Sequence, residues 1–168
     1  MCQLFRYTGG VTQETRWLDA GQQQAWRAYL RMQGELNARL SRDLQANSDL
    51  SMADFAVLVH LTDVPDGRVR VLELARNLHW EKSRISHHIG RMEKRGLVRR
   101  ENCRSDGRGA FVVLTDEGRE AIEAAAPRHV EQVRELMFDN LTDEEVAVLA
   151  RISQRVVDKL TTACDEPA

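Results

Sequence analysis

Apolar residues recur at helical spacing in several long stretches of the chain. The first stretch predicts a helix over 21–46, capped by Asp19, with a longer apolar stripe than one small domain needs. Asp54 stands three residues after Ser51, the spacing of a capping box, and predicts the start of a second helix that ends at the turn-forming residues 65–67. Part of the first stripe is therefore expected to meet a partner chain.

Two more helices are predicted in the last third of the chain. Thr115 is a suitable N-cap for the first of them, and Pro127 should bend or break that helix. Thr142 and Glu145 repeat the capping-box spacing ahead of the last helix. Its apolar positions are Val146, Val148, Leu149, Ile152, Val156, Val157 and Leu160.

The centre of the chain carries two short segments of helical period close together. Leu74 lies in the first segment, and Ile85, Ile89 and Met92 lie in the second. This arrangement is typical of a helix-turn-helix. Basic side chains and then Gly96 follow the last apolar position, so the second helix should end just before that glycine.

Short strands are expected directly after this helix pair. Residues 97–101 and 110–114 have strand character and flank 103–109, a turn with two glycines. A further short strand over 69–71 is expected beside them. A helix-turn-helix followed by a hairpin predicts a winged helix with a basic tip, which is a unit that reads DNA.

The outer face of the second helix has the composition of a DNA-reading surface. When Ile85, Ile89 and Met92 turn inward, small, polar and basic residues remain outside and suit the floor of a major groove. The alternative is an ordinary solvated face. No Ser, Thr, Asp or Asn stands at the expected start of this helix, and Glu81 there should point away from phosphates. The outer-face residues are Lys82, Ser83, Ser86, His87 and Gly90.

These segments resemble the MarR family of bacterial transcriptional regulators. The matching residues are Leu74-Ala75, Ser83, Ser86, the run 91–100, Asp106-Gly107-Arg108 and the run 114–118. The resemblance implies that Asp106 and Arg108 pair in the wing and that the arginine enters the minor groove. A guanidinium held by a carboxylate is pre-aimed, and a narrow minor groove attracts arginine. The alternative, a pair that only stabilises the turn, stays open.

The resemblance also implies a homodimer whose first and last helices interlock two chains. A two-fold dimer would place its recognition helices about one DNA turn apart, so the operator should be a pseudo-palindrome. The alternative is a monomer in which these helices only cover the winged helix. Repression, the common mode of the family, is our expectation. The candidate DNA-binding residues are Lys82, Ser83, Arg84, Ser86, His87, Arg91, Arg104, Asp106 and Arg108.

The expected fold is mainly α, a winged helix-turn-helix with a short β-hairpin wing between N- and C-terminal dimerisation helices. The predicted regions are a flexible extension over 1–18, a dimerisation helix over 19–48, the winged helix-turn-helix over 49–115, C-terminal dimerisation helices over 116–162 and a tail over 163–168.

The charge of the chain is segregated along the sequence. The formal net charge is only -2. Residues 76–108 nevertheless contain ten Lys or Arg against four Asp or Glu, so the rest of the chain carries the negative excess. A basic patch on an acidic body is typical of a DNA-binding protein.

The cysteines and the apolar runs favour a cytoplasmic protein. The apolar runs are too short to span a bilayer, and we expect neither a signal peptide nor membrane contact. Three widely spaced cysteines, Cys2, Cys103 and Cys164, indicate no disulfide framework. Adjacent histidines such as His87 and His88 face different sides of a helix and cannot chelate one ion alone. No metal site and no cofactor are expected.

A small aromatic or phenolic effector that releases DNA is implied by the resemblance. Such a ligand would lie between the dimer helices and the winged helix. The alternative is that the candidate residues are only core or rim side chains. The candidates are Trp26, Tyr29, Arg31, Phe55, His60 and His129.

Three other functions are compared with that of a ligand-responsive DNA-binding regulator. The basic surroundings of Cys103 could activate its thiol, which makes a redox-sensing regulator an alternative. A winged-helix module that contacts protein instead of DNA is a second alternative. An enzyme is disfavoured, because Cys103, Asp116 and His129 have no spacing typical of a catalytic site.

Overall fold

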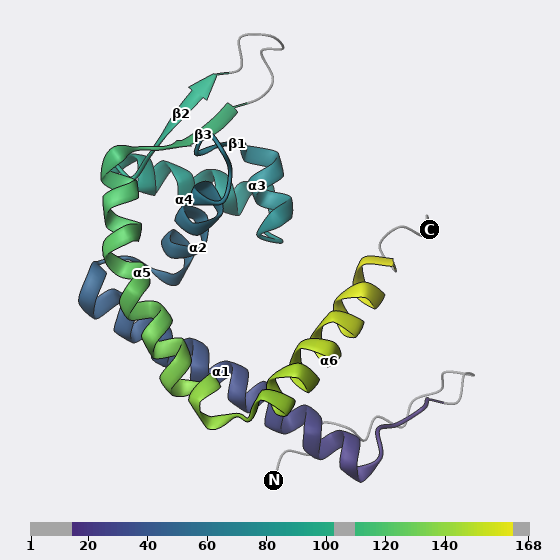
Figure 1. Ribbon diagram of the computed structural model, residues 1–168. Coiled ribbons are helices and arrows are strands. Elements are labelled where there is room, and N and C mark those ends of the chain that lie inside the picture. The colour runs from purple at the N-terminus through teal and green to yellow at the C-terminus, as the bar shows by residue number, and fades with distance from the viewer. Residues whose placement is uncertain (1–14, 103–109, 163–168) are drawn as a thin grey trace. The chain divides into compact units, whose positions relative to one another are not determined.

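A computed structural model describes residues 15–102 and 110–162 of the chain. In this part the elements are α1 (Ala20–Ser48), α2 (Met52–Thr62), β1 (Arg68–Arg70), α3 (Val71–Asn77), α4 (Lys82–Lys94), β2 (Val98–Asn102), β3 (Ala110–Leu114), α5 (Asp116–Leu136), the 3-10 turn η1 (Phe138–Asn140) and α6 (Asp143–Thr162) (Figure 1). The mainly helical winged helix-turn-helix is confirmed. The chain divides into two units between Glu35 and Leu36, within α1.

The capping box at the start of α2 is confirmed. The Ser51 hydroxyl accepts a hydrogen bond from the Asp54 backbone N–H, and the Asp54 carboxylate accepts one from the Ser51 backbone N–H at 2.9 Å. Two of the N–H groups that a helix start leaves unpaired are thereby satisfied. The same helix supplies Val57, Leu58 and Leu61 to the core, where all three are fully buried.

The helix pair α3 and α4 packs on this core as the sequence predicts. Leu74, Ile85, Ile89 and Met92 have no exposed surface. Helix α4 ends at Lys94, and Gly96 follows with φ of 75°, a left-handed conformation that favours glycine. No side chain caps the start of α4, again as predicted.

The three strands form an antiparallel sheet with the order β1-β3-β2. Strands β2 and β3 form the hairpin that extends beyond α4 in Figure 1. The prediction of a strand over 69–71 is wrong by one residue. The strand is Arg68–Arg70, because Val71 already begins α3 and Arg68 pairs with Val113 across the ladder.

Helix α5 starts at a confirmed cap and continues through its proline. The Thr115 hydroxyl accepts from the Gly118 backbone N–H at 3.0 Å. Pro127 does not break the helix, so that part of the prediction is wrong. A proline removes one backbone hydrogen bond, and the long helix on both sides of it keeps its other bonds and its buried Ile122 and Ala125.

The two ends of the described chain expose apolar side chains. Helix α6 buries none of its residues, and Ile152, Val156, Val157 and Leu160 are at least half exposed.

In the unit that ends at Glu35, Asp19 caps α1 through a 2.8 Å bond from the Gln22 N–H. Among the described residues, no helix is long and apolar enough to cross a membrane.

Candidate nucleic-acid interface

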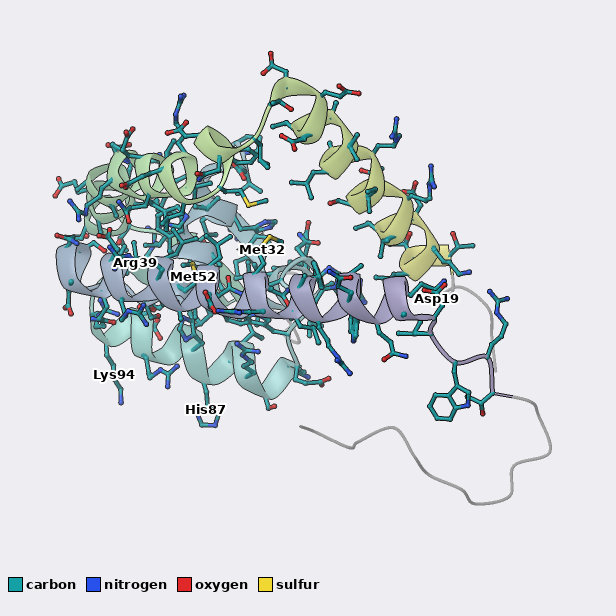
Figure 2. The ribbon with its side chains drawn as sticks, turned by 90° about the horizontal axis from the view of Figure 1, so that it is seen from below. Asp19, Met32, Arg39, Met52, His87 and Lys94 are labelled. Atoms are coloured by element: carbon teal, nitrogen blue, oxygen red, sulfur yellow. The ribbon has the colours of Figure 1, made fainter. Side chains whose placement is uncertain are left out.

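The outer face of α4 is polar and accessible, as the sequence predicts. Lys82, Ser83, Arg84 and His87 are exposed, while Ser86 is half-buried. His87 projects from this helix into solvent, on the same side as Lys94 (Figure 2). A row of this kind presents hydroxyl, imidazole and ammonium groups outward from one rigid element.

Two of the predicted DNA-binding cations already have partners within the protein. The guanidinium of Arg84 lies 4.3 Å from the centre of the Trp80 ring. Arg91 places Nη2 2.9 Å from Nδ1 of His88. Both side chains are exposed, so each guanidinium is held by a neighbouring ring while it remains at the surface.

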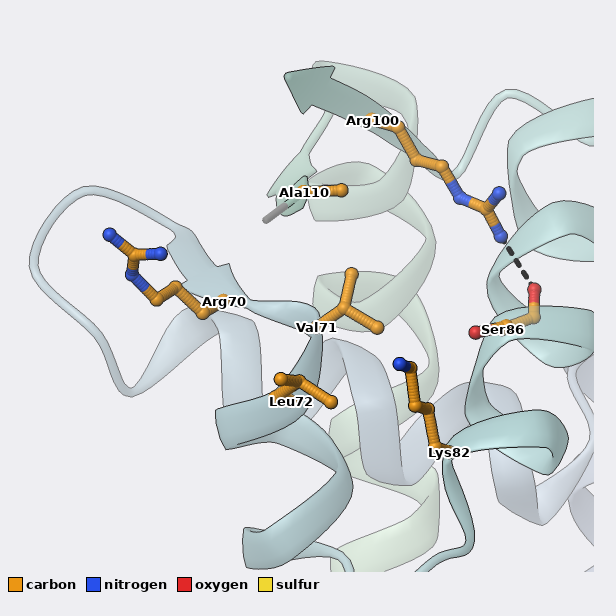
Figure 3. A pocket seen from close by; sticks show the side chains of 7 residues that line it. All are labelled: Arg70, Val71, Leu72, Lys82, Ser86, Arg100 and Ala110. Atoms are coloured by element: carbon orange, nitrogen blue, oxygen red, sulfur yellow. Dashed lines mark hydrogen bonds between the residues drawn. The ribbon is translucent and has the colours of Figure 1, made fainter. Parts of the chain in front are cut away.

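A hollow of about 230 Å³ lies beside α4, between this helix, α3 and the sheet (Figure 3). Lys82 and Ser86 line it from α4, and Arg100 lines it from β2. Arg100 donates to the Ser86 backbone carbonyl at 2.5 Å. Its backbone N–H donates to the carboxylate of Glu93 at 2.9 Å. These two hydrogen bonds connect β2, the first strand of the wing, to α4.

Arg70 and Arg100 also belong to this surface, although neither is among the DNA-binding candidates predicted from the sequence. Both line the same hollow as Lys82. Strand alternation offered a signal for Arg100, because residues two apart share a face and Val98 is buried toward the core. No comparable signal marks Arg70, which lies in the middle of the short strand expected over 69–71.

The opposite face of the sheet is also rich in arginine. Phe111 lies between two guanidinium groups, with Arg68 at 3.8 Å and Arg70 at 4.9 Å from its ring centre. Glu101 accepts from Arg99 at 2.9 Å and lies 3.3 Å from Arg68. The sheet therefore carries positive charge on both sides of the β2–β3 hairpin.

A buried carboxylate beneath α4 connects this helix to α2. Asp54, 4% exposed, accepts from Arg95 at 2.8 Å and lies 3.1 Å from Nε2 of His88. Burial alone would raise the pKa of this carboxyl group, but the adjacent His88 imidazole and the hydrogen bonds from Ser51 and Arg95 outweigh burial and hold the pKa well below its usual range. Asp54 is thus ionised in the folded protein.

Two pairs of predicted effector residues are in contact, one in each unit of the described chain. Phe55 and His129 lie with ring centres 4.3 Å apart, and burial lowers the pKa of His129. Nε2 of His60 lies 3.0 Å from the Asn77 side-chain amide. In the unit that ends at Glu35, Trp26 stacks on Tyr29 with ring centres 5.7 Å apart, and Arg31 pairs with Glu35 at 2.7 Å.

Four of the predicted site residues lie outside the described part of the chain. They are Cys103, Arg104, Asp106 and Arg108, from the tip of the wing. Within 15–102 and 110–162, no group of three or more His, Cys, Asp or Glu could hold a metal ion.

Comparison with known proteins identifies the family of this interface. The sequence model of the MarR family matches residues 48–109, which run from the end of α1 to the wing. The transcriptional regulator HosA of Escherichia coli is 32% identical over 111 residues, covering 66% of this chain and 79% of that protein. The chain belongs to the MarR family. Its members are transcriptional regulators, which agrees with the prediction that this chain is not an enzyme.

Solved structures of MarR-family proteins have the same fold. AbsC, a MarR-family transcriptional regulator from Streptomyces coelicolor, is 41% identical, with a TM-score of 0.83 over 88% of this chain and 99% of that chain. Sco3205 from the same organism, solved in complex with DNA, is 42% identical, with a TM-score of 0.84 over 88% of this chain and 92% of that chain. The winged helix described here is thus the arrangement of this family.

Proposed function

We propose that this MarR-family regulator represses transcription by binding a pseudo-palindromic operator as a homodimer. The observation that carries the proposal is the outer face of α4, polar and basic over a fully buried apolar face. Sco3205, the similar protein solved with DNA, supports the same role for this chain. Helix α4 would enter the major groove and the wing would reach the adjacent minor groove.

Different residues of the interface have different tasks in this proposal. Ser83, Ser86 and His87 carry polar groups on the outer face of α4 and would hydrogen-bond base edges. Lys82 and Arg91 carry charge beside them and would contact phosphates or guanine. Arg104 and the Asp106–Arg108 pair would act at the wing, with the arginine in the minor groove.

The two-fold dimer is supported by the apolar surface that a single chain leaves exposed. Helix α6 exposes Ile152 and Val156, and α1 exposes Trp26 and Leu30. Exposed apolar surface on this scale is a mark of an association site. A homodimer through these helices would present two α4 helices to the two half-sites of one operator.

The DNA-binding proposal is tested by fluorescence anisotropy with duplex DNA from upstream of the protein's own coding region, at two salt concentrations. Arg91→Ala and Arg108→Ala are each expected to weaken selective binding about tenfold and to lower the salt dependence by about one released counterion. Arg134→Ala removes the same charge from α5, outside the interface, and should change neither. Binding no better than to unrelated duplex, and indifferent to both arginines, would instead indicate a protein-binding winged helix.

We also propose that a small aromatic acid or phenol releases the DNA. The contact between the buried Phe55 and the half-buried His129 supports this, because an aromatic ring and an imidazole together suit an aromatic anion. Titration calorimetry with a panel of phenolic acids should give heat that Phe55→Ala abolishes. A panel without heat, together with loss of DNA binding on peroxide treatment that Cys103→Ser prevents, would favour thiol sensing.

A further inference from the structure

A buried histidine occupies the middle of the recognition helix, directly behind one of its exposed arginines. His88 is 5% exposed and follows His87, which points into solvent. Both ring nitrogens of His88 face charged side chains. Nδ1 lies 2.9 Å from Nη2 of Arg91, and Nε2 lies 3.1 Å from Oδ1 of Asp54. The indole of Trp80 closes the site edge-on, with ring centres 5.3 Å apart.

The partners of His88 determine which nitrogen carries the proton. A guanidinium can only donate hydrogen bonds, so Nδ1 must accept from Arg91 and must be unprotonated. The ring proton then sits on Nε2, opposite the carboxylate of Asp54. The Nε2–Asp54 contact is close without being a well-aligned hydrogen bond, so its contribution is largely electrostatic.

Asp54 is itself fixed, and this makes His88 a rigid support. The carboxylate accepts from Arg95 at 2.8 Å, and from the Ser51 hydroxyl at 2.8 Å and backbone N–H at 2.9 Å. The series Asp54, His88, Arg91 therefore leads from the start of α2 to the outer face of α4. Arginine side chains lose substantial rotamer entropy when they bind, and a partner that holds the guanidinium beforehand reduces that loss.

We propose that His88 is a positioning residue for DNA recognition, which holds the guanidinium of Arg91 ready for the operator while Asp54 orients the imidazole. This inference rests on the proposed function, because it needs Arg91 to contact DNA. The imidazole itself stays buried behind α4 and touches no base. Its contribution is expected in selective binding, where the direction of a donor decides which partner it reaches. Non-selective attraction to phosphates depends on charge and should not need it.

The first test uses the wild-type protein. Nitrogen-15 spectra of histidine-labelled protein at neutral pH distinguish the two neutral tautomers of an imidazole, and His88→Gln assigns the signal by its disappearance. We expect an unprotonated Nδ1 and a protonated Nε2 at His88. A proton on Nδ1 would overturn the proposal, because that nitrogen could not then accept from Arg91.

The second test measures affinity for the upstream duplex and for unrelated duplex by anisotropy. His88→Leu, which keeps the volume and removes both nitrogens, should weaken selective binding about fivefold and leave non-selective binding unchanged. His88→Gln can still accept from Arg91 and donate to Asp54, so it should stay within about twofold of wild type. In an Arg91→Ala background, His88→Leu should cause no further loss.

The outcomes separate this inference from the function on which it rests. A selective wild type, with His88→Leu and Arg91→Ala losses that simply add, would overturn the positioning role and leave the proposed function intact. A wild type that binds both duplexes equally would overturn the proposed function and the positioning role together. If His88→Leu does not fold, the tautomer and the His88→Gln affinity still decide the matter.

Discussion

Asp54 combines two roles that are usually separate. It completes the capping box of α2 with Ser51, and it accepts from Arg95 at the end of α4. A buried charge is tolerated only when hydrogen bonds replace its lost water. Here Ser51 and Arg95 supply three of them. The carboxylate thereby joins α2 to the end of α4, although Asp54 and Arg95 are 41 positions apart in the sequence.

The low pKa of Asp54 makes the stability of the protein depend on acid. Because the folded pKa lies below the unfolded value of about 3.9, the stabilisation is fully present above pH 4 or so and is lost as pH falls toward the folded pKa. Asp54→Asn should lower the free energy of unfolding at pH 7 by about 3 kcal/mol and flatten its decline below pH 4.

Urea titrations at several pH values would check this acid dependence. Asp139→Asn is the matched control. Asp139 is exposed and forms a surface ion pair with Arg134 at 3.6 Å, so this substitution should change the free energy of unfolding little. An Asp54→Asn protein as stable as wild type would show that the network contributes nothing net.

Only the local half of the Asp54 network could be predicted from the sequence. The Ser51–Asp54 spacing is local, so the capping box could be predicted from the sequence. The contacts with His88 and Arg95 depend on how α2 and α4 pack, and no local pattern encodes that. The sequence marks Arg91 as a DNA-binding candidate, a basic residue in the run that matches the MarR family, but its contact with His88 appears only in the fold.

At the scale of elements, the junction of α5 with the sheet leaves no room for a side chain. A Cβ on Gly118 would stand 2.0 Å from the Leu97 carbonyl oxygen and 3.0 Å from Leu114. Gly118→Ala should therefore force the start of α5 away from β2. We expect a loss of about 2 to 4 kcal/mol of unfolding free energy, measured by denaturant titration.

Gly90→Ala is the control for this prediction. Gly90 lies inside α4, and its added Cβ would meet only Arg100 Nη2, at an ordinary 3.6 Å. Alanine is a better helix former than glycine, so this variant should gain up to about 1 kcal/mol in the absence of DNA. Equal effects of the two substitutions would contradict the tight junction.

Element boundaries were predicted best where a side chain marks them. Thr115, Ser51 and Gly96 mark ends through hydrogen bonds or backbone conformation. The short strand β1 was shifted by one residue because its position is set by pairing with β3, which is distant in sequence. The prediction that Pro127 breaks α5 is wrong, because the local cost of the proline is offset by the hydrogen bonds and buried side chains of the rest of the helix.

At the scale of the whole molecule, α6 leads to a prediction about assembly. Ile152 and Val156 are each more than half exposed and stand four residues apart, on one side of the helix. Val156→Glu would place an unpaired charge in the proposed dimer interface. We expect it to weaken dimerisation at least about thirtyfold, measured by sedimentation equilibrium.

Gln154→Glu adds the same charge to the same helix and serves as the control. Gln154 bonds Asp158 at 2.7 Å and lies on the opposite side of α6, so its change should leave the dimer intact. A Val156→Glu protein that dimerises like wild type would exclude this face of α6 from the interface.

The side chain of Arg95 connects the end of α1 to α4. Arg95, the C-cap of α4, donates to the Asp49 carbonyl just after α1 at 2.6 Å and to Asp54 at 2.8 Å. These two hydrogen bonds fix the position of the Arg95 guanidinium relative to both elements. We therefore expect a rotation of the last turn of α1 to be transmitted to α4 through Arg95. In the proposed dimer, such a rotation would change the distance between the two α4 helices. Arg95 would then be the residue that couples the orientation of α4 to that of α1.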